Sequence, residues 1–411
     1  MLSSCTFALV LLTSSLEDVI HQPAVELLSL SPTEFTVSNV KALRSRLEHE
    51  RDEALEKRKN EEEAWKKQLR VVRRGLDDLN RKSSVDTEAS AARRSKLHIE
   101  IAALENTIRQ SVLDRDRAVR TYDLQLTKLW LAETWPGRRQ EIQKQIRSGE
   151  GRERRHGDVE DTGYRTIAKD PDKDIEAGQQ AVRQMLAGGY LPSEIHDEEV
   201  QSFVRRVAER IAMNSDLKVP LHVTVLDDKE LRAISLPGGF VYVTSGVITA
   251  AQSESELAGV LSREIARIAA RHAARAAKSS WLSRMILPVT QIAGGIFAGG
   301  PANPAAYYGL GYGMEGLSGI LGRALTANSE EFQMEADQLG VQYAWKAGYD
   351  PAGFVSFLDS IAGKEKTFVT ETPELRKRLL NLFTEIEHLP VQKKPAPVSG
   401  DFDRIRQRLT Q

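Results

Sequence analysis

Two arginines flank a glutamate at the spacing of a metal-binding helix. Residues 262–267 read Ser-Arg-Glu-Ile-Ala-Arg, which places Arg263 and Arg267 one helical turn apart, with Glu264 beside the first. If both positions were histidine, the two imidazoles would converge on one Zn²⁺, and the glutamate would activate a zinc-bound water as general base. A guanidinium has no lone pair to donate and stays protonated in proteins. The helix therefore has the layout of a zinc site but lacks two of its ligands.

The segments around this motif predict a small sheet packed against helices. Residues 221–225 alternate as a strand does, and 233–243 form a second strand region, which Leu236-Pro237-Gly238-Gly239 interrupts with a bulge or tight turn. Residues 254–278 have apolar side chains at helical spacing and are predicted to be the helix that carries the two arginines. Two further amphipathic helices precede the sheet, at 174–186 and 200–213.

Several blocks of this region resemble family forty-eight of the metallopeptidases. The blocks occur in the order of the family's motifs and are 235–244, 255–261, Glu264 with Arg271-His272, 331–340 and 347–351. The resemblance covers about 174–382. It implies an α+β, mostly helical fold: a zincin-like metallopeptidase domain with a small sheet and an active-site helix.

The family's motifs also imply roles for individual positions. Glu264 matches the general base and Glu335 the third zinc ligand, whereas Arg263 and Arg267 replace the two ligand histidines. The family has a further histidine near its zinc, in the motif Ser-Thr-His-Pro, and here Thr372 replaces it. An extended substrate of the family lies along an edge strand, through main-chain pairing that needs no metal. The residues that match this peptide-groove strand are Gly239, Phe240, Val241, Tyr242 and Val243.

No other histidine has the spacing to replace the lost ligands. His272 lies eight residues beyond Glu264, about 12 Å along a continuous helix, which is too far to share a metal through bonds of about 2 Å. The remaining candidates lie outside the matched blocks and are interpreted as ordinary surface or core histidines, namely His156, His196, His222 and His388. No cofactor is therefore expected, and zinc only if the metal site is atypical.

The arginines suggest a replacement for the metal. Arg263 and Arg267 project from the helix face that would have held Zn²⁺, toward Glu335 and Asp337. Our hypothesis is that a guanidinium pairs with Glu335 and replaces both the charge of the metal and its cross-link between two helices. The simpler alternative is that one arginine forms the pair while the other is solvated.

A long region of different character precedes this domain. Residues 37–135 contain almost no Gly or Pro, and their apolar residues recur at steps of three and four on either side of a polar segment, 81–90. The first run is Trp65, Leu69, Val72, Leu76 and Leu79; the second is Leu97, Ile101, Leu104, Ile108, Val119, Tyr122, Leu126 and Leu129. This pattern predicts an antiparallel helical hairpin of the coiled-coil type, which Trp135-Pro136-Gly137 would end.

The predicted organisation has five parts. They are an N-terminal segment at 1–36, the hairpin at 37–135, a polar linker at 136–173, the peptidase-like domain at 174–390, and a tail at 391–411 with a short helix at 402–409. The first part contains an apolar run and Leu2-Ser3-Ser4-Cys5, which resembles a lipobox, so a signal peptide, a lipoprotein anchor, a misassigned start and a frayed terminus all stay open. No run is long and apolar enough for a spanning helix; the best candidate, 285–300, is interrupted by Pro288.

Charge and cysteine content limit the classes of partner. The 57 Lys and Arg nearly cancel the 58 Asp and Glu, so no overall field indicates nucleic acid or an anionic lipid surface. The single cysteine, Cys5, excludes an internal disulfide and leaves the redox compartment open. The family resemblance implies a bacterial cell envelope or periplasm, with the cytoplasm as the alternative.

Three functions stay open at this point. The first is a peptidase-like protein without catalysis that binds polypeptides or partner proteins, through the edge strand or the hairpin, as a chaperone or adaptor. The second is an active metalloendopeptidase with an atypical metal site. The third is a structural coiled-coil scaffold with a passive head. Self-association through the hairpin, and membrane association without spanning, are compatible with all three.

Overall fold

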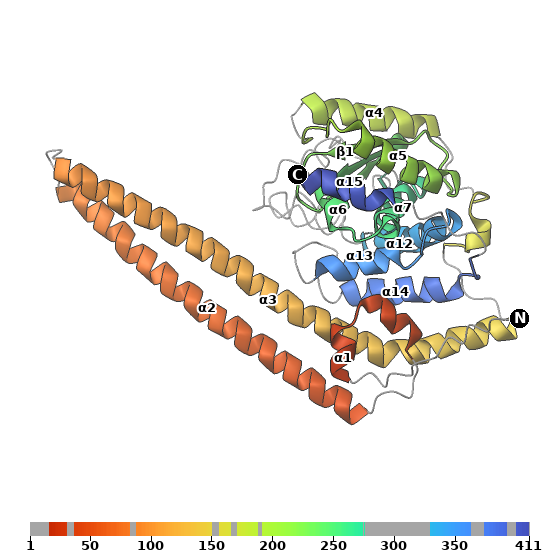
Figure 1. Cartoon of the computed structure of the whole chain (residues 1–411), viewed down its shortest axis with the longest axis horizontal. Helices are drawn as coiled ribbons and strands as arrows, with labels where there is room; N and C mark the ends of the chain where they lie inside the picture. Colours follow the sequence, from red (N-terminus) through yellow and green to blue (C-terminus); the bar gives the residue numbers. More distant parts are fainter. Residues whose placement is uncertain are drawn as a thin grey trace, which may run out of the picture.

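The protein consists of a long helical hairpin joined to a mostly helical domain with one small sheet. The computed structural model describes residues 16–30, 37–82, 88–149, 156–165, 171–187, 191–273, 275, 329–362, 374–392 and 400–410. In Figure 1 the hairpin projects to the left of the domain, and the sheet lies among the domain's helices. The predicted α+β, mostly helical fold is confirmed. Within the described residues, no helix is long and apolar enough to cross a membrane.

The hairpin is formed by α2 (Val37–Lys82) and α3 (Glu88–Ser148). Ion pairs between the helices define their antiparallel register, because the α3 partner moves back along the chain as the α2 partner moves forward. These pairs are Arg44 with Glu133, Arg51 with Asp123, Glu62 with Arg115, and Arg73 with Glu105. The predicted apolar runs face each other, but most of their members are only half-buried, since two helices alone cannot enclose them.

The expected helix break at Trp135-Pro136-Gly137 is wrong, because α3 continues through Pro136 to Ser148. A proline inside a helix costs one backbone hydrogen bond and clashes with the preceding turn. Packing offsets that cost, since Trp135 and Ile142 are fully buried in the main core. The Trp135 indole N–H donates to the Leu28 carbonyl at 3.1 Å, and its ring packs edge-on against Phe383 with centroids 5.2 Å apart. The first part of the predicted linker is therefore the end of the hairpin, docked on the domain.

Part of the N-terminal segment is also folded onto the domain. It forms α1 (Leu16–His21) and a 3-10 helix, η1 (Ala24–Ser29). Asp359 of the domain accepts a hydrogen bond from the Ala24 backbone at 2.9 Å and pairs with Lys128 of α3 at 2.8 Å. This ion pair joins three segments that are far apart in sequence. The lipobox-like residues and the apolar run before Leu16 lie outside the described residues.

The sheet has three strands in the order β1-β3-β2. β1 (His222–Leu226) pairs in parallel with β3 (Phe240–Thr244), and β2 (Ala233–Leu236) pairs with β3 in antiparallel fashion. The predicted tight turn lies between β2 and β3 as η3 (Pro237–Gly239), where Gly238 and Gly239 have φ of 77° and 97°. The strand predicted to lie at the edge, Gly239 to Val243, is instead the central strand. The edge strand that contacts the arginine helix is β2.

Helices cover the sheet and complete the core around α7 (Glu254–Ala269). The others are η2 (Val159–Asp161), α4 (Pro171–Ala187), α5 (Glu198–Met213), α6 (Ser245–Ala250), α12 (Ser329–Lys346), α13 (Gly353–Ala362), α14 (Glu374–His388) and α15 (Asp401–Thr410). The short helix predicted at the C-terminus is present as α15. It docks on α5, where Phe402 meets the Phe203 ring and Arg408 pairs with Asp197 at 2.7 Å.

Candidate functional site

The site is built on α7, which is buried on nearly every side. Ser253 caps its N-terminus by accepting a hydrogen bond from the Glu256 backbone, as expected for a serine at this position. Gly259 allows α13 to approach closely, because a Cβ there would lie 2.7 Å from the Phe354 backbone nitrogen. These contacts fix α7 in the domain, and therefore fix the position of the residues it carries.

A second glycine brings α12 against the arginine position. A Cβ on Gly340 would lie 3.0 Å from the Cα of Arg263, which is tighter than almost all real contacts. The close crossing lets side chains one turn earlier on α12 reach α7. Glu335 and Asp337, the two acidic residues singled out in the sequence, are both buried at this crossing.

One cluster of charges surrounds Arg263. Its Nε donates to Asp337 Oδ1 at 2.9 Å, and its Nη1 donates to Glu264 Oε1 at 2.8 Å. Arg378 of α14 approaches Asp337 from the other side with two hydrogen bonds, of 2.7 and 2.8 Å. All four side chains are buried. Two guanidiniums and two carboxylates thus balance in charge inside the core, as buried ions require.

The carboxylate of Glu264 has further partners. The Ser235 hydroxyl of β2 donates to its Oε2 at 2.7 Å, and the Nε of Arg267 lies 3.8 Å from the same oxygen. Arg267 is more exposed than Arg263, with a quarter of its side chain accessible (27%). In the peptidase reaction this carboxylate would have to accept a proton from water. Here both of its oxygens already have partners, because Oε1 accepts a hydrogen bond from Arg263 and Oε2 accepts one from the Ser235 hydroxyl, with Arg267 close by.

The end of α7 overturns one argument from the sequence. The helix predicted to be continuous over 254–278 is broken, because α7 ends at Ala269 and Arg271 adopts a left-handed backbone with φ of 55°. Two hydrogen bonds from Arg271 to Asp174, of 2.5 and 2.6 Å, accompany this unusual conformation. Because the helix does not continue, His272 is not carried about 12 Å along its axis, and its side chain turns back to Glu335.

A second cluster surrounds Glu335. His272 Nε2 lies 2.9 Å from Oε2, and Arg275 Nη1 donates to the same oxygen at 2.6 Å. His156 Nδ1, from the segment before η2, lies 3.5 Å from Oε1. His156, which was interpreted as an ordinary surface or core histidine, thus lies beside Glu335. Phe332 completes the cluster, since the His272 ring stacks on it with centroids 4.6 Å apart and Arg275 lies over its face.

The protonation states of this cluster follow from burial and charge. Burial lowers the pKa of His272 to about 4, with the hydrogen bond to Glu335 opposing that shift and the charges of Arg267 and Arg275 adding to it. Burial alone would raise the pKa of Glu335, but the hydrogen bonds from His156 and His272 and the charge of Arg275 outweigh it, so its pKa lies well below the usual range. At neutral pH the cluster is an ionised carboxylate that binds a neutral imidazole and a guanidinium.

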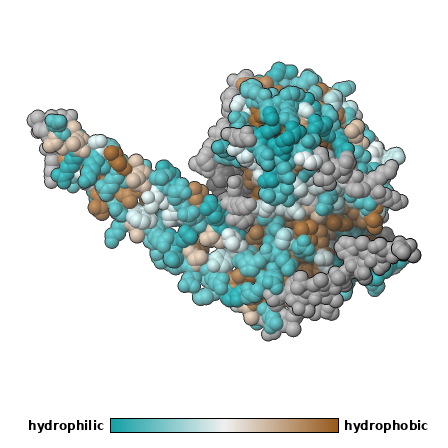
Figure 2. Space-filling model, in the orientation of Figure 1, coloured by the Kyte–Doolittle hydropathy of each residue, from teal (hydrophilic) through white to brown (hydrophobic). Residues whose placement is uncertain are grey.

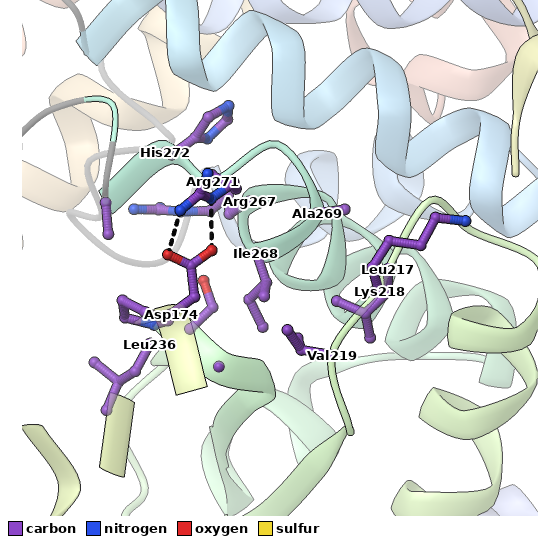
Figure 3. A pocket seen from close by; sticks show the side chains of 14 residues that line it. Asp174, Leu217, Lys218, Val219, Leu236, Arg267, Ile268, Ala269, Arg271 and His272 are labelled. Atoms are coloured by element: carbon purple, nitrogen blue, oxygen red, sulfur yellow. Dashed lines mark hydrogen bonds and ion pairs between the residues drawn. The ribbon is translucent and has the colours of Figure 1, made fainter. Parts of the chain in front are cut away.

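A small pocket lies between the end of α7 and β2. Figure 3 shows it lined by Arg267, Ile268 and His272 from α7 and the turn after it, and by Leu236 at the end of β2. The Arg271–Asp174 pair forms one of its walls. The pocket is thus bounded by the edge strand on one side and by the second arginine of the motif on the other.

The predicted site residues are therefore brought together, but with other partners than expected. Arg263 forms one cluster with Glu264 and Asp337. Glu335 was expected to pair with Arg263 or Arg267, but it pairs with Arg275 and His272. Arg378 was missed, although its signal is present in the sequence, since it occupies a core position between Leu375, Leu379 and Leu382 on one helix face. Thr372 lies outside the described residues.

The residues at the site do not fit a zinc ion. Arg263 and Arg267 cannot donate a lone pair, and Glu335 already accepts hydrogen bonds on both sides. In the part of the chain that the structure describes, no group of three or more His, Cys, Asp or Glu is arranged to hold a metal ion. The arrangement can orient side chains and bind ligands by charge.

The fold and the position of the site define a metallopeptidase-type domain with a central helix in the place of the zinc helix. The family model of Peptidase family M48 matches residues 194–386, which contain the sheet, α7 and the helices around it. The resemblance of the sequence blocks to that family is thereby confirmed.

The chain is also similar to several proteins with assigned names. The chain is 30% identical over 246 residues to the beta-barrel assembly-enhancing protease of Yersinia pestis, an alignment that covers 57% of this chain and 47% of that protein. It is 25% identical over 207 residues to the Escherichia coli K12 protein of the same name, covering 49% and 40%. It is 28% identical over 186 residues to the mitochondrial metalloendopeptidase OMA1 of Schizosaccharomyces pombe, covering 43% and 50%. The chain thus spans about half the length of these relatives.

Proposed function

We propose that this protein is a non-catalytic member of its peptidase family that captures extended polypeptide, in the manner of a chaperone or adaptor. The single observation that carries the proposal is the environment of Glu264. The residue that would act as general base is held between Arg263 and the Ser235 hydroxyl, and the ligand positions on either side of it are guanidiniums.

The charge of the site supports this reading. A zinc ion with two neutral histidines contributes two positive charges, and Arg263 with Arg267 contribute the same number. The acidic residues inherited from the zinc site are thus neutralised without metal: Arg263 binds Glu264 and Asp337, and Arg275 binds Glu335. Leaving such a carboxylate buried without a partner would cost several kcal/mol. The substitutions are therefore compensated within the fold.

Polypeptide capture would use the sheet edge beside the arginines. Among the described strands β2 pairs only with β3, so its other side can accept an added strand from an extended peptide. Such pairing needs backbone groups and no metal. Because Ser235 of β2 is bound to Glu264, the edge is also fixed relative to α7.

The proposal is tested by adding an unfolded polypeptide such as reduced carboxymethylated casein to the full chain. The expected result is complex formation without cleavage, with slower amide hydrogen exchange at 233–236 in the complex and unchanged exchange at 222–226, which serves as the internal control. Cleavage of casein that is abolished by Glu264→Gln would overturn the proposal. Absence of any complex would also overturn it.

A second candidate function is an active metalloendopeptidase with an atypical metal site. The observation that favours it is the approach of two imidazoles, those of His156 and His272, to the carboxylate of Glu335. Against it stands Arg275, whose guanidinium lies 2.6 Å from Glu335 Oε2 and would repel a dication. One equivalent of zinc that is lost on His272→Ala, in a protein that cleaves casein, would favour this function over the first.

The third reading, a scaffold whose hairpin does the work, gains support from the way α3 enters the domain core at Trp135. It is separated from the first by the same casein experiment, since a passive head would leave amide hydrogen exchange at β2 unchanged.

We place the protein in the cell envelope of a bacterium, because two of its relatives are bacterial proteins named for beta-barrel assembly. Detection in fractionated cells tests that location.

A further inference from the structure

The charges of the hairpin are segregated along its length, although the charges of the whole chain nearly cancel. Residues 66–82 and 88–99, which form the far end of the two helices, contain ten Lys and Arg against three Asp and Glu. Residues 48–63, nearer the domain, contain eight Asp and Glu against four Lys and Arg. The far end therefore has a strong positive charge of its own.

Most of the described basic side chains of the far end are exposed to solvent. On α2, Lys67, Arg70 and Arg74 follow one another at steps of three and four and are exposed, while Val72 and Leu76 on another face are buried against α3. On α3, Arg93 and Lys96 are exposed as well. In Figure 2 the surface of the projecting hairpin is mostly hydrophilic, with a few separate hydrophobic side chains.

The positive end is electrically separate from the domain. Leu47 is the last residue of α2 that is buried together with α1, and Arg74 lies 27 residues further along the helix, about 40 Å at 1.5 Å per residue. The Debye length at physiological salt is about 8 Å. The charges of the domain are therefore largely screened at the far end.

Two exposed apolar side chains lie among these cations. Val71 and Ile99 are 62% and 69% exposed, far more than the apolar residues between the helices. Val71 directly follows Arg70, and Ile99 is three residues after Lys96. Cations next to exposed apolar groups suit the interface of a bilayer, where the charges meet anionic headgroups and the apolar groups enter the acyl boundary.

We propose that the far end of the hairpin, residues 66–82 and 88–99, binds an anionic phospholipid surface and holds the domain at a distance from it. A nucleic acid fits less well, because its phosphates would give the exposed Val71 and Ile99 no role. The proposal does not depend on whether the edge strand β2 binds a polypeptide. Each cation near an anionic leaflet strengthens binding about fivefold.

The test is flotation of the full chain with vesicles of phosphatidylcholine, with and without phosphatidylglycerol. The tip variant replaces Lys67, Arg70, Arg74, Arg93 and Lys96 by glutamine. The matched control replaces the same number of exposed cations elsewhere on the two helices, namely Lys41, Lys57, Lys59, Lys144 and Arg147. Glutamine has a helix propensity close to that of Lys and Arg, so both variants are expected to fold, which circular dichroism checks.

The wild type and the control are expected to float only with phosphatidylglycerol vesicles. The tip variant is expected to bind them on the order of a thousandfold more weakly, at about fivefold for each of its five cations. Higher salt should weaken the wild type, and Val71→Ser with Ile99→Ser should remove the part of binding that resists salt. Equal binding by the tip variant and the control would overturn the proposal. So would a wild type that ignores the vesicles and instead self-associates at low salt, which would assign the positive end to the acidic stretch 48–63 of a second copy.

Discussion

Arg263 binds Asp337 across the crossing of α7 and α12, with Nε and Oδ1 2.9 Å apart. The same guanidinium also binds Glu264, its neighbour on α7. The position that would carry the first zinc ligand thus cross-links the two helices that a zinc ion would otherwise join. Because this cross-link is a buried ion pair, we expect its removal to lower the free energy of unfolding strongly.

Arg263→Met is expected to lower the free energy of unfolding by about 3 kcal/mol or more, because it leaves Glu264 and Asp337 buried with one cation fewer. Urea denaturation measures the change. Arg117→Met is the control, since 63% of the Arg117 side chain is exposed on the hairpin, and it should change stability by less than about 0.5 kcal/mol. Equal effects of the two substitutions would contradict the role of Arg263 in the core.

Neither added zinc nor an added chelator is expected to change the melting temperature of the wild type. A ligand that binds only the native state stabilises it by about 4 kcal/mol at a thousand times its Kd, which a melting curve detects easily. The residues at the site offer no such binding, because the ligand positions are guanidiniums and Glu335 is already bound by Arg275. A melting temperature that rises with zinc concentration, and falls again with chelator, would contradict the absence of a metal site.

Trp135 anchors the hairpin to the domain, so its removal should lower the stability of the folded protein. Trp135→Ala removes a fully buried ring that packs against Phe383 and a hydrogen bond to the Leu28 carbonyl. The expected cost is about 3–5 kcal/mol of unfolding free energy. Trp65→Ala, on the outer hairpin with 38% of the residue exposed, should cost much less. Similar losses for the two would show that α3 is not anchored at Trp135.

The sequence predicted the elements of the site well because their patterns are local. The helical spacing of the arginines, the two glycines before β3 and the apolar runs of the hairpin all depend on residues close together in the chain. What it missed depends on distant packing. Pro136 reads as a helix end, yet α3 continues because Trp135 and Ile142 are buried in the main core.

The partners of the acidic residues were missed for a related reason. The distance argument against His272 assumed a continuous helix, and the left-handed residue Arg271 carries no sequence signal strong enough to end it. Arg378 and His156 come from segments that only the tertiary fold brings to the crossing of α7 and α12. The central position of β3 in the sheet could not be predicted either, because local spacing predicts strands but not their order in a sheet.

Two glycines in helices should respond to alanine in opposite directions. Gly259→Ala places a Cβ 2.7 Å from the Phe354 nitrogen, so α7 and α13 must separate, and the free energy of unfolding should fall by about 1–3 kcal/mol. Gly75→Ala meets no atom within 4 Å on the exposed hairpin, so it should raise helix stability by about 0.5–1 kcal/mol through propensity alone. Thermal denaturation followed by circular dichroism compares the two. A destabilised Gly75→Ala would mean that the far end of the hairpin is covered by a partner or a second copy under those conditions, and a neutral Gly259→Ala would mean that α13 is not packed against α7 as closely as the backbone contact requires.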